Sequence, residues 1–316
     1  MNKKYNGSVN YEKNWKRAGL AVGLSFSLFL AACGNDDDTS TDGESGDNGD
    51  SSTAVAESLD YTITGIDAGA GVVARAQEAV ETYNLEGYEV QVSSSAAMTS
   101  ALATAIENEE PIVVTGWNPH WKFAEFDLKY LEDPEGVFGE AEDIHTITRL
   151  GLEEDMPEAV EVLGNFFWTE DDMAIIMNDI NNGADPAVAA EDWFDANQDK
   201  VAEWTDGVAT VDGDSISLAF VAWDSEIAST NLMKLVLESV GYEVDISALE
   251  NSFMWEAIAS NEADAMVAAW LPVTHATQWE QFEDRVVDLG PNLEGAAIGL
   301  VVPEYMDITS IEDLNN

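Results

Sequence analysis

The sequence predicts an α/β fold of two similar lobes that hold a ligand between them. The first observation is an internal duplication, because the motif Gly-Tyr-Glu-Val at residues 87–90 recurs at 241–244. The second is an alternation of predicted strands and helices, which is typical of parallel sheets. The third is a set of apolar runs, at 113–117, 220–223 and 267–270, that each end in tryptophan. Ligands of α/β sheets bind at the carboxyl ends of strands, so these runs point to one cleft.

The elements of the two copies can be predicted in order. In the first copy, residues 61–66 read as a strand, Gly69-Ala70-Gly71 leads into a helix from Val72, and a Trp-ended strand closes the unit. In the second, the strand spans 216–223 and a helix starts at Ser225. A helical insertion is expected over about 157–204, and 299–303 read as a strand that returns to the first lobe. Two crossings of the chain predict a two-stranded hinge.

Four regions are expected along the chain. Residues 1–32 resemble a lipoprotein signal peptide, with a basic start, an apolar stretch and the sequence Leu-Ala-Ala before Cys33. Cys33 is the predicted lipidation site, against the alternative of an ordinary secretory signal. Residues 33–57 are polar and acidic and are expected to be a disordered tether. Lobe 1 is expected to comprise 58–148 with 300–316, and lobe 2 residues 149–299.

The charge of the chain is extremely acidic. It has 62 acidic and 12 basic residues, a formal net charge of −50. Nucleic acid is excluded as a partner because its phosphates would be repelled. The hydrophobic content of 46% argues for a folded body. Such acidity fits a protein from a halophile, where salt screens self-repulsion, or else an ordinary acidic extracellular protein.

The tryptophans suggest a site for a cation. Trp117, Trp223 and Trp270 would form an aromatic wall, and ring faces attract quaternary ammonium groups. For any one of them alone, a packing role in the core is the simpler interpretation. Their equivalent positions at predicted strand ends favour a shared site.

A second group of residues suggests a site for an anion. Free backbone N–H groups at a helix start could bind a carboxylate, here those of Gly71 and Val72, although the glycines could equally serve only the turn. His275 follows Trp270 by five residues and could donate a further hydrogen bond. With three His and one Cys, no dense metal site or cofactor is expected. A cation site and an anion site together describe a small zwitterion.

Four segments, at residues 64–71, 113–121, 222–230 and 268–275, resemble the glycine-betaine-binding lipoproteins of OpuA-type ABC importers. The resemblance extends over about 58–316. It implies a two-lobe, type II periplasmic-binding-protein fold, an ammonium cage of Trp117, Trp223 and Trp270, and a carboxylate site of Gly71, Val72 and His275. It departs from the family pattern at Asn118, where Thr is common.

The resemblance also implies a function. The chain would be no enzyme but a lipid-anchored binding protein on the outer face of the cell membrane. It would capture glycine betaine, and proline betaine as well, for osmoprotection, and deliver it to a permease driven by a separate ATPase subunit. The alternatives are a choline or carnitine binding protein, a lipid-anchored hydrolase that uses His275, and a surface adhesin.

Overall fold

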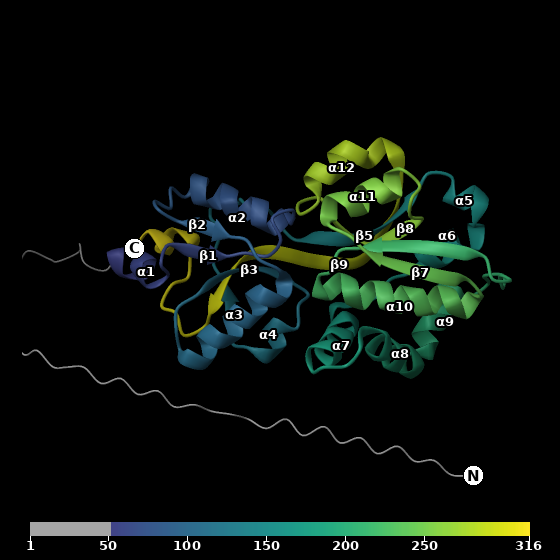
Figure 1. The fold of residues 1–316 in the computed structure, drawn as a ribbon, viewed down its shortest axis with the longest axis horizontal. Helices are drawn as coiled ribbons and strands as arrows, with labels where there is room; N and C mark the ends of the chain where they lie inside the picture. Colours follow the sequence, from purple (N-terminus) through teal and green to yellow (C-terminus); the bar gives the residue numbers. More distant parts are fainter. Residues whose placement is uncertain (1–51) are drawn as a thin grey trace, which may run out of the picture. The chain divides into compact units, whose positions relative to one another are not determined.

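The computed structural model describes residues 52–316, and their strands join into one nine-stranded sheet (Figure 1). The predicted signal peptide, Cys33 and most of the predicted tether lie outside the described residues. The sheet has two groups of parallel strands, which we call the first and second half, and two long antiparallel strands between them.

The first half is built around the shortest strands. β1 (Thr62–Thr64) lies between β2 (Glu89–Gln91) and β3 (Val113–Asn118), and the three run parallel. β9 (Val286–Pro303) pairs antiparallel with β3, and β4 (Leu128–Tyr130) pairs antiparallel with β9. The helices of this half are α2 (Gly71–Thr82), α3 (Ser95–Asn108) and α4 (Lys122–Glu125).

The second half repeats this arrangement. β6 (Ser215–Phe220) lies between β7 (Glu243–Ala248) and β8 (Ala265–Leu271), again in parallel. β5 (Glu142–Arg149) pairs antiparallel with β8, and β9 pairs with the other edge of β5. The helices are α5 (Leu152–Asp155), α6 (Pro157–Asn165), α7 (Glu170–Asn181), α8 (Pro186–Ala196), α9 (Gln198–Thr205), α10 (Asp224–Val240), α11 (Asn251–Ala259), α12 (Ala276–Phe282) and the 3₁₀ turn η1 (Glu283–Arg285).

The two halves therefore share one strand order. In each half, three parallel strands are followed by a long antiparallel strand, β9 after β3 and β5 after β8, and then by one more antiparallel strand. This confirms the predicted α/β class and the two-lobed plan. The repeated Gly-Tyr-Glu-Val motif has a local cause. Gly87 and Gly241 have φ angles of 84° and 115°, a left-handed conformation that glycine adopts freely, and each precedes the second strand of its half.

The crossings lie close to β5 and β9. β9 pairs with β5 through residues 286–296 and with β3 through 297–301, so one continuous strand serves both halves (Figure 1). The other crossing lies between β4 and β5. Because β5 pairs with β8 along its length, this pairing favours a crossing before Glu142 rather than after Thr148. The exact lobe boundaries stay predictions.

The folded body begins earlier than the predicted tether end at residue 57. α1 (Ser52–Ser58) packs against the C-terminal turn η2 (Ile311–Asn315), and the Val55 N–H donates to the Asn316 carbonyl over 3.1 Å. Ala56 and Leu59 are buried. Apolar residues in an otherwise polar stretch thus attach this end of the chain to the first half.

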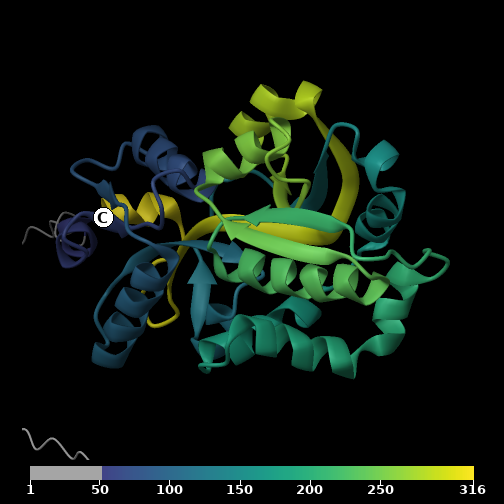
Figure 2. The same ribbon diagram turned by 45° about the vertical axis from the view of Figure 1, so that its right-hand side comes forward.

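Helices cover the sheet of the second half on both faces (Figure 2). α10 packs against β7 and β8 on one face, with α7 and α8 outside it, while α11 contacts β6. α6 to α9 form the predicted helical insertion. Among the described residues, no helix is long and apolar enough to cross a membrane.

Candidate functional site

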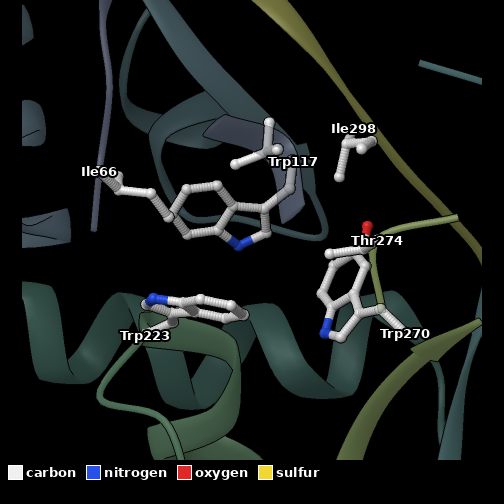
Figure 3. Close-up of a pocket in the computed structure, with 7 residues that line it drawn as sticks. Ile66, Trp117, Trp223, Trp270, Thr274 and Ile298 are labelled. Atoms are coloured by element: carbon white, nitrogen blue, oxygen red, sulfur yellow. The ribbon is translucent and has the colours of Figure 1, made fainter. Parts of the chain in front are cut away.

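One cavity brings together side chains from both halves (Figure 3). The three predicted tryptophans face a common space, with aliphatic side chains around them. The lining residues are Ile66, Val72, Trp117, Trp223, Trp270, Thr274 and Ile298. The tryptophans are nearly inaccessible, with exposures of 4%, 5% and 2%. The cavity is therefore aromatic, enclosed and shared by the two halves.

The three indoles reach the cavity from two kinds of local structure. Trp117 lies near the end of β3, and Trp270 near the end of β8, as predicted. Trp223 differs, because β6 ends at Phe220 and Trp223 is the N-cap of α10. The prediction of a strand over 216–223 was wrong at this end. The chain turns after Phe220, and the Trp223 N–H donates to the Val221 carbonyl over 2.8 Å.

Carboxylates hold two of the three rings. The Trp270 Nε1–H donates to Glu226 Oε1 over 2.6 Å, and the Trp223 Nε1–H donates to Asp67 Oδ2 over 3.1 Å. The second bond joins the two halves. Trp117 Nε1 has no hydrogen-bond partner among the described residues. Instead, Lys122 Nζ lies 4.4 Å from the centre of the Trp117 ring.

Two of the side chains behind the cage are buried and ionisable. Glu226 is 1% exposed, and burial raises its pKa to about 7 although Ser225 Oγ and Trp270 Nε1 donate to it. Lys122 is completely buried, and loss of hydration lowers its pKa to about 7. Desolvation thus brings the pKa of both groups close to neutral pH.

The start of α2 presents backbone N–H groups that have no hydrogen-bond partner in the described part of the chain. Ala70 is the N-cap and supplies no side-chain acceptor, and no hydrogen bond within residues 52–316 uses the Gly71 or Val72 N–H. The Thr274 carbonyl of the second half approaches Gly71 so closely that a Cβ on Gly71 would lie 1.9 Å from its oxygen. Gly71 is therefore required where the two halves meet.

His275 lies just behind the cavity rather than in its lining. It is completely buried, its ring stacks on Trp223 with centroids 6.0 Å apart, and its Nδ1 accepts the Trp270 N–H over 3.0 Å. Burial lowers its pKa to about 3, so the imidazole is neutral with its proton on Nε2. Nε2 has no partner among the described residues, which leaves one free donor.

A second set of bonds crosses between the halves beside the cavity. Asp224, the first residue of α10, accepts hydrogen bonds from Ser95 Oγ over 2.7 Å and from Trp121 Nε1 over 2.8 Å. His120 Nε2 lies 3.5 Å from the same carboxylate. These donors outweigh desolvation and lower the pKa of Asp224. Asp224 is thus an ionised acceptor that ties α10 to the first half.

The turn after β8 is fixed from the hinge side. The buried Glu142 of β5 accepts the N–H groups of Val273 and Thr274, each over 2.9 Å, and the Thr274 hydroxyl. This carboxylate fixes the Thr274 backbone that lies against Gly71.

The structure brings the predicted site residues into one place: the three tryptophans and Val72 line the cavity, and Gly71 and His275 flank it. Sequence reasoning missed Ile66, Thr274 and Ile298 as lining residues and Asp67 and Glu226 as supports. Four of these lie in the segments that resemble the family, where position within the motif was the available signal. Ile298 is on β9, and only the returning strand places it at the site.

Comparisons with known proteins place the chain in a family. Residues 46–196 and 214–316 match the family described as the substrate binding domain of ABC-type glycine betaine transport systems. The glycine betaine/carnitine transport binding protein GbuC of Listeria monocytogenes is 54% identical over 268 residues, which cover 84% of this chain and 89% of that protein.

Two solved structures are similar over part of their length. Lactococcal OpuAC, in a closed conformation with glycine betaine, is 48% identical over 46% of this chain and 57% of its own, with a TM-score of 0.45. An ABC-transporter choline binding protein in complex with choline is 29% identical over 60% of this chain and 62% of its own, with a TM-score of 0.46. These alignments span less than two thirds of either solved chain. The family match and the identity to GbuC show that the chain belongs to the substrate-binding domains of ABC-type glycine betaine transport systems.

Proposed function

We propose that this protein captures glycine betaine, and also proline betaine, outside the cell and delivers it to an ABC permease. The observation that carries the proposal is the pairing of three buried indoles with two free backbone N–H groups across one enclosed cavity. The indole faces would hold the trimethylammonium group, and the N–H groups of Gly71 and Val72 with His275 Nε2–H would bind the carboxylate.

The energies of these contacts are sufficient for useful affinity. A desolvated cation–π contact contributes about 0.5 to 2 kcal/mol. Three such contacts and charge-assisted hydrogen bonds to the carboxylate would reach roughly micromolar affinity, which corresponds to about 8 kcal/mol. An enclosed site without an arginine clamp fits a small zwitterion better than a dianion.

The decisive test is calorimetric titration with glycine betaine, proline betaine, carnitine and choline. We expect glycine betaine to bind most tightly, and no heat with any of the four ligands would contradict the proposal. Choline or carnitine binding is the second candidate, since relatives bear those names. The variant His275→Ala separates glycine betaine from choline, because it should weaken glycine betaine and leave choline, which lacks a carboxylate, unaffected; carnitine has a carboxylate and is distinguished by its affinity in the titration.

A hydrolase is disfavoured by the surroundings of His275. A catalytic histidine usually has one ring nitrogen oriented by a carboxylate, whereas His275 Nδ1 accepts a backbone N–H and the ring is buried. Turnover of an ester or amide that disappears in His275→Ala would overturn this view. Tight binding of a betaine would likewise count against a pure adhesin.

The location of the protein is part of the proposal. We infer that Cys33 carries a lipid that anchors the chain on the outer face of the membrane, next to its permease and ATPase subunits. Mass spectrometry of the protein from membranes should show an acylated N-terminal Cys33, and Cys33→Ser should release the protein.

The net charge of −50 further supports a halophilic source. Refolding should then require high salt, and full stability at low ionic strength would contradict it.

A further inference from the structure

The carboxylates behind the cage are arranged in a pattern that the binding of a zwitterion does not by itself require. Two cage indoles donate their N–H to a carboxylate, Trp270 to Glu226 and Trp223 to Asp67. Each carboxylate therefore lies at the N–H edge of its ring. Both rings line the cavity (Figure 3).

Among the described residues, Glu226 has no oppositely charged partner, although a buried carboxylate normally has one. None of the ion pairs within residues 52–316 includes Glu226 or Asp67, although Glu226 is 1% exposed. Burying a charge is costly unless an opposite charge or several hydrogen bonds compensate. A cation held within the cage would supply the missing opposite charge.

The geometry also strengthens the rings as cation acceptors. An N–H that donates to an anion leaves the indole more electron-rich, and the negative ring face is what attracts a cation. In an enclosed apolar cavity the carboxylate charge is weakly screened, so it acts on the ligand through space as well.

We propose that Glu226 and Asp67 are specificity-determining residues that make the cage select a positively charged trimethyl group over a neutral group of the same shape. The proposal rests on the proposed function. The carboxylates act through Trp270 and Trp223 and do not touch the ligand. A purely structural alternative is that they only hold the two rings in place.

The test compares glycine betaine with its carbon isostere, 3,3-dimethylbutanoate, which keeps the carboxylate and in which an uncharged tert-butyl group replaces trimethylammonium. Wild type, Glu226→Gln and Asp67→Asn are titrated at about pH 8.5, where carboxyl groups are ionised. The amides keep a hydrogen-bond acceptor for the indole and remove only the charge. Glu161→Gln, an exposed carboxylate on α6, is the control for net charge. The affinity of the isostere is measured by displacement of glycine betaine.

We expect Glu226→Gln and Asp67→Asn each to bind glycine betaine about tenfold more weakly, while their affinity for the isostere changes by less than about twofold. An equal loss for both ligands would show that the carboxylates only position the rings, and it would overturn the proposal. Unchanged affinity for glycine betaine in both variants would overturn it as well. Wild type that binds no betaine would instead refute the proposed function.

A second measurement separates charge from ring position. Near-ultraviolet circular dichroism of the ligand-free variants reports whether the tryptophans keep their fixed surroundings. An unchanged spectrum together with weakened betaine binding supports the proposal. A lost tryptophan signal with weakened binding would assign the carboxylates a positioning role and overturn the selection by charge. Asp67→Asn keeps the test open if Glu226→Gln fails to fold, because Asp67 is partly exposed.

Discussion

The starts of α2 and α10 occupy the same place in the two halves, directly after the first strand, yet they are built in opposite ways. α2 has a small N-cap, Ala70, and no acidic residue in its first turn. α10 has Trp223 as its N-cap and carries Asp224 and Glu226 in its first turn. A helix start attracts anions through its free N–H groups and its dipole. In α2 no acidic residue of the first turn uses that attraction, whereas in α10 the protein supplies its own anions.

The difference shows how a duplicated scaffold can produce a site with two unlike ends. The carboxylates of α10 are used by neighbours, since Asp224 binds donors from the first half and Glu226 binds the Trp270 ring. In the proposed site, one helix start would serve as the anion site, and its counterpart would support the aromatic cage. This polarity matches a molecule with a carboxylate at one end and an ammonium group at the other.

The substitution expected to weaken the proposed carboxylate site at the start of α2 most is Gly71→Ala. The new Cβ would lie 1.9 Å from the Thr274 carbonyl oxygen, so the two halves could not approach and the N–H groups would lose their cover. We expect glycine-betaine affinity, measured by calorimetry, to fall about a hundredfold or more. Gly69→Ala is the matched control, because nothing lies within 4 Å of its Cβ. Wild-type affinity in Gly71→Ala would contradict the carboxylate site.

The corresponding change on the α10 side is Trp223→Ala. It removes one wall of the cage and a bond between the halves, and it should cost about 1 to 2 kcal/mol of binding free energy, or roughly tenfold in affinity. Trp117→Ala and Trp270→Ala should each cost about 1 kcal/mol or more. Trp223→Phe keeps a ring face and should lose less. Normal betaine binding by all three alanine variants would contradict the proposal that these tryptophans bind the ammonium group.

The buried histidine next to both helix starts makes stability depend on pH. Burial lowers the pKa of His275 to about 3, whereas an unfolded histidine titrates near about 6.5. The unfolded chain therefore binds more protons between these values, and stability falls as pH decreases through that range. His120, with its pKa lowered to about 4, acts in the same direction. Glu226, with its pKa raised to about 7, opposes them, because its folded form gains stability on acidification from about 7 towards 4.5.

A variant isolates the contribution of His275. In His275→Gln, the loss of unfolding free energy between about pH 7 and about pH 5 should be smaller than in wild type by about 2 kcal/mol. Denaturant unfolding at the two pH values measures it. Equal pH dependence in the two proteins would show that His275 is not held neutral by burial.

The smallest expected effect is that of Asp224→Asn. It removes the charge that Ser95 and Trp121 bind across the halves, and it should weaken glycine betaine by about threefold to tenfold. Because these bonds join the halves, the unfolding midpoint of the ligand-free protein should change little. Ser95→Ala removes one donor and should give a smaller loss. A large fall in the ligand-free midpoint would mean that Asp224 serves folding rather than closure.

Much of this arrangement could be predicted from periodicity and duplication. The parallel strands, the helical insertion and the ends of β3 and β8 follow from short apolar runs and repeated turns, and the structure confirms them. The place of Trp223 was half correct, since it lines the cavity but caps a helix. A strand and the turn that follows it look alike when both are apolar.

The features that sequence reasoning could not supply are long-range contacts. The approach of Thr274 to Gly71 joins residues distant in the chain, and no local pattern marks it. The bonds of Glu226 and Asp67 were equally hidden, because a chain with 62 acidic residues gives no reason to single out two carboxylates. Ile298 depends on the register of β9 against β3.

The enclosure of the cavity has a consequence for the rate at which a ligand is released. Its tryptophan walls are at most 5% exposed, and Thr274 lies over the start of α2, so we expect a bound molecule to leave only when the halves separate. The dissociation rate should then equal the rate at which the halves separate, whatever the strength of the individual contacts. Residence time would be set by the bonds that join the halves, and a transporter that pulls them apart would release its cargo without competing for it.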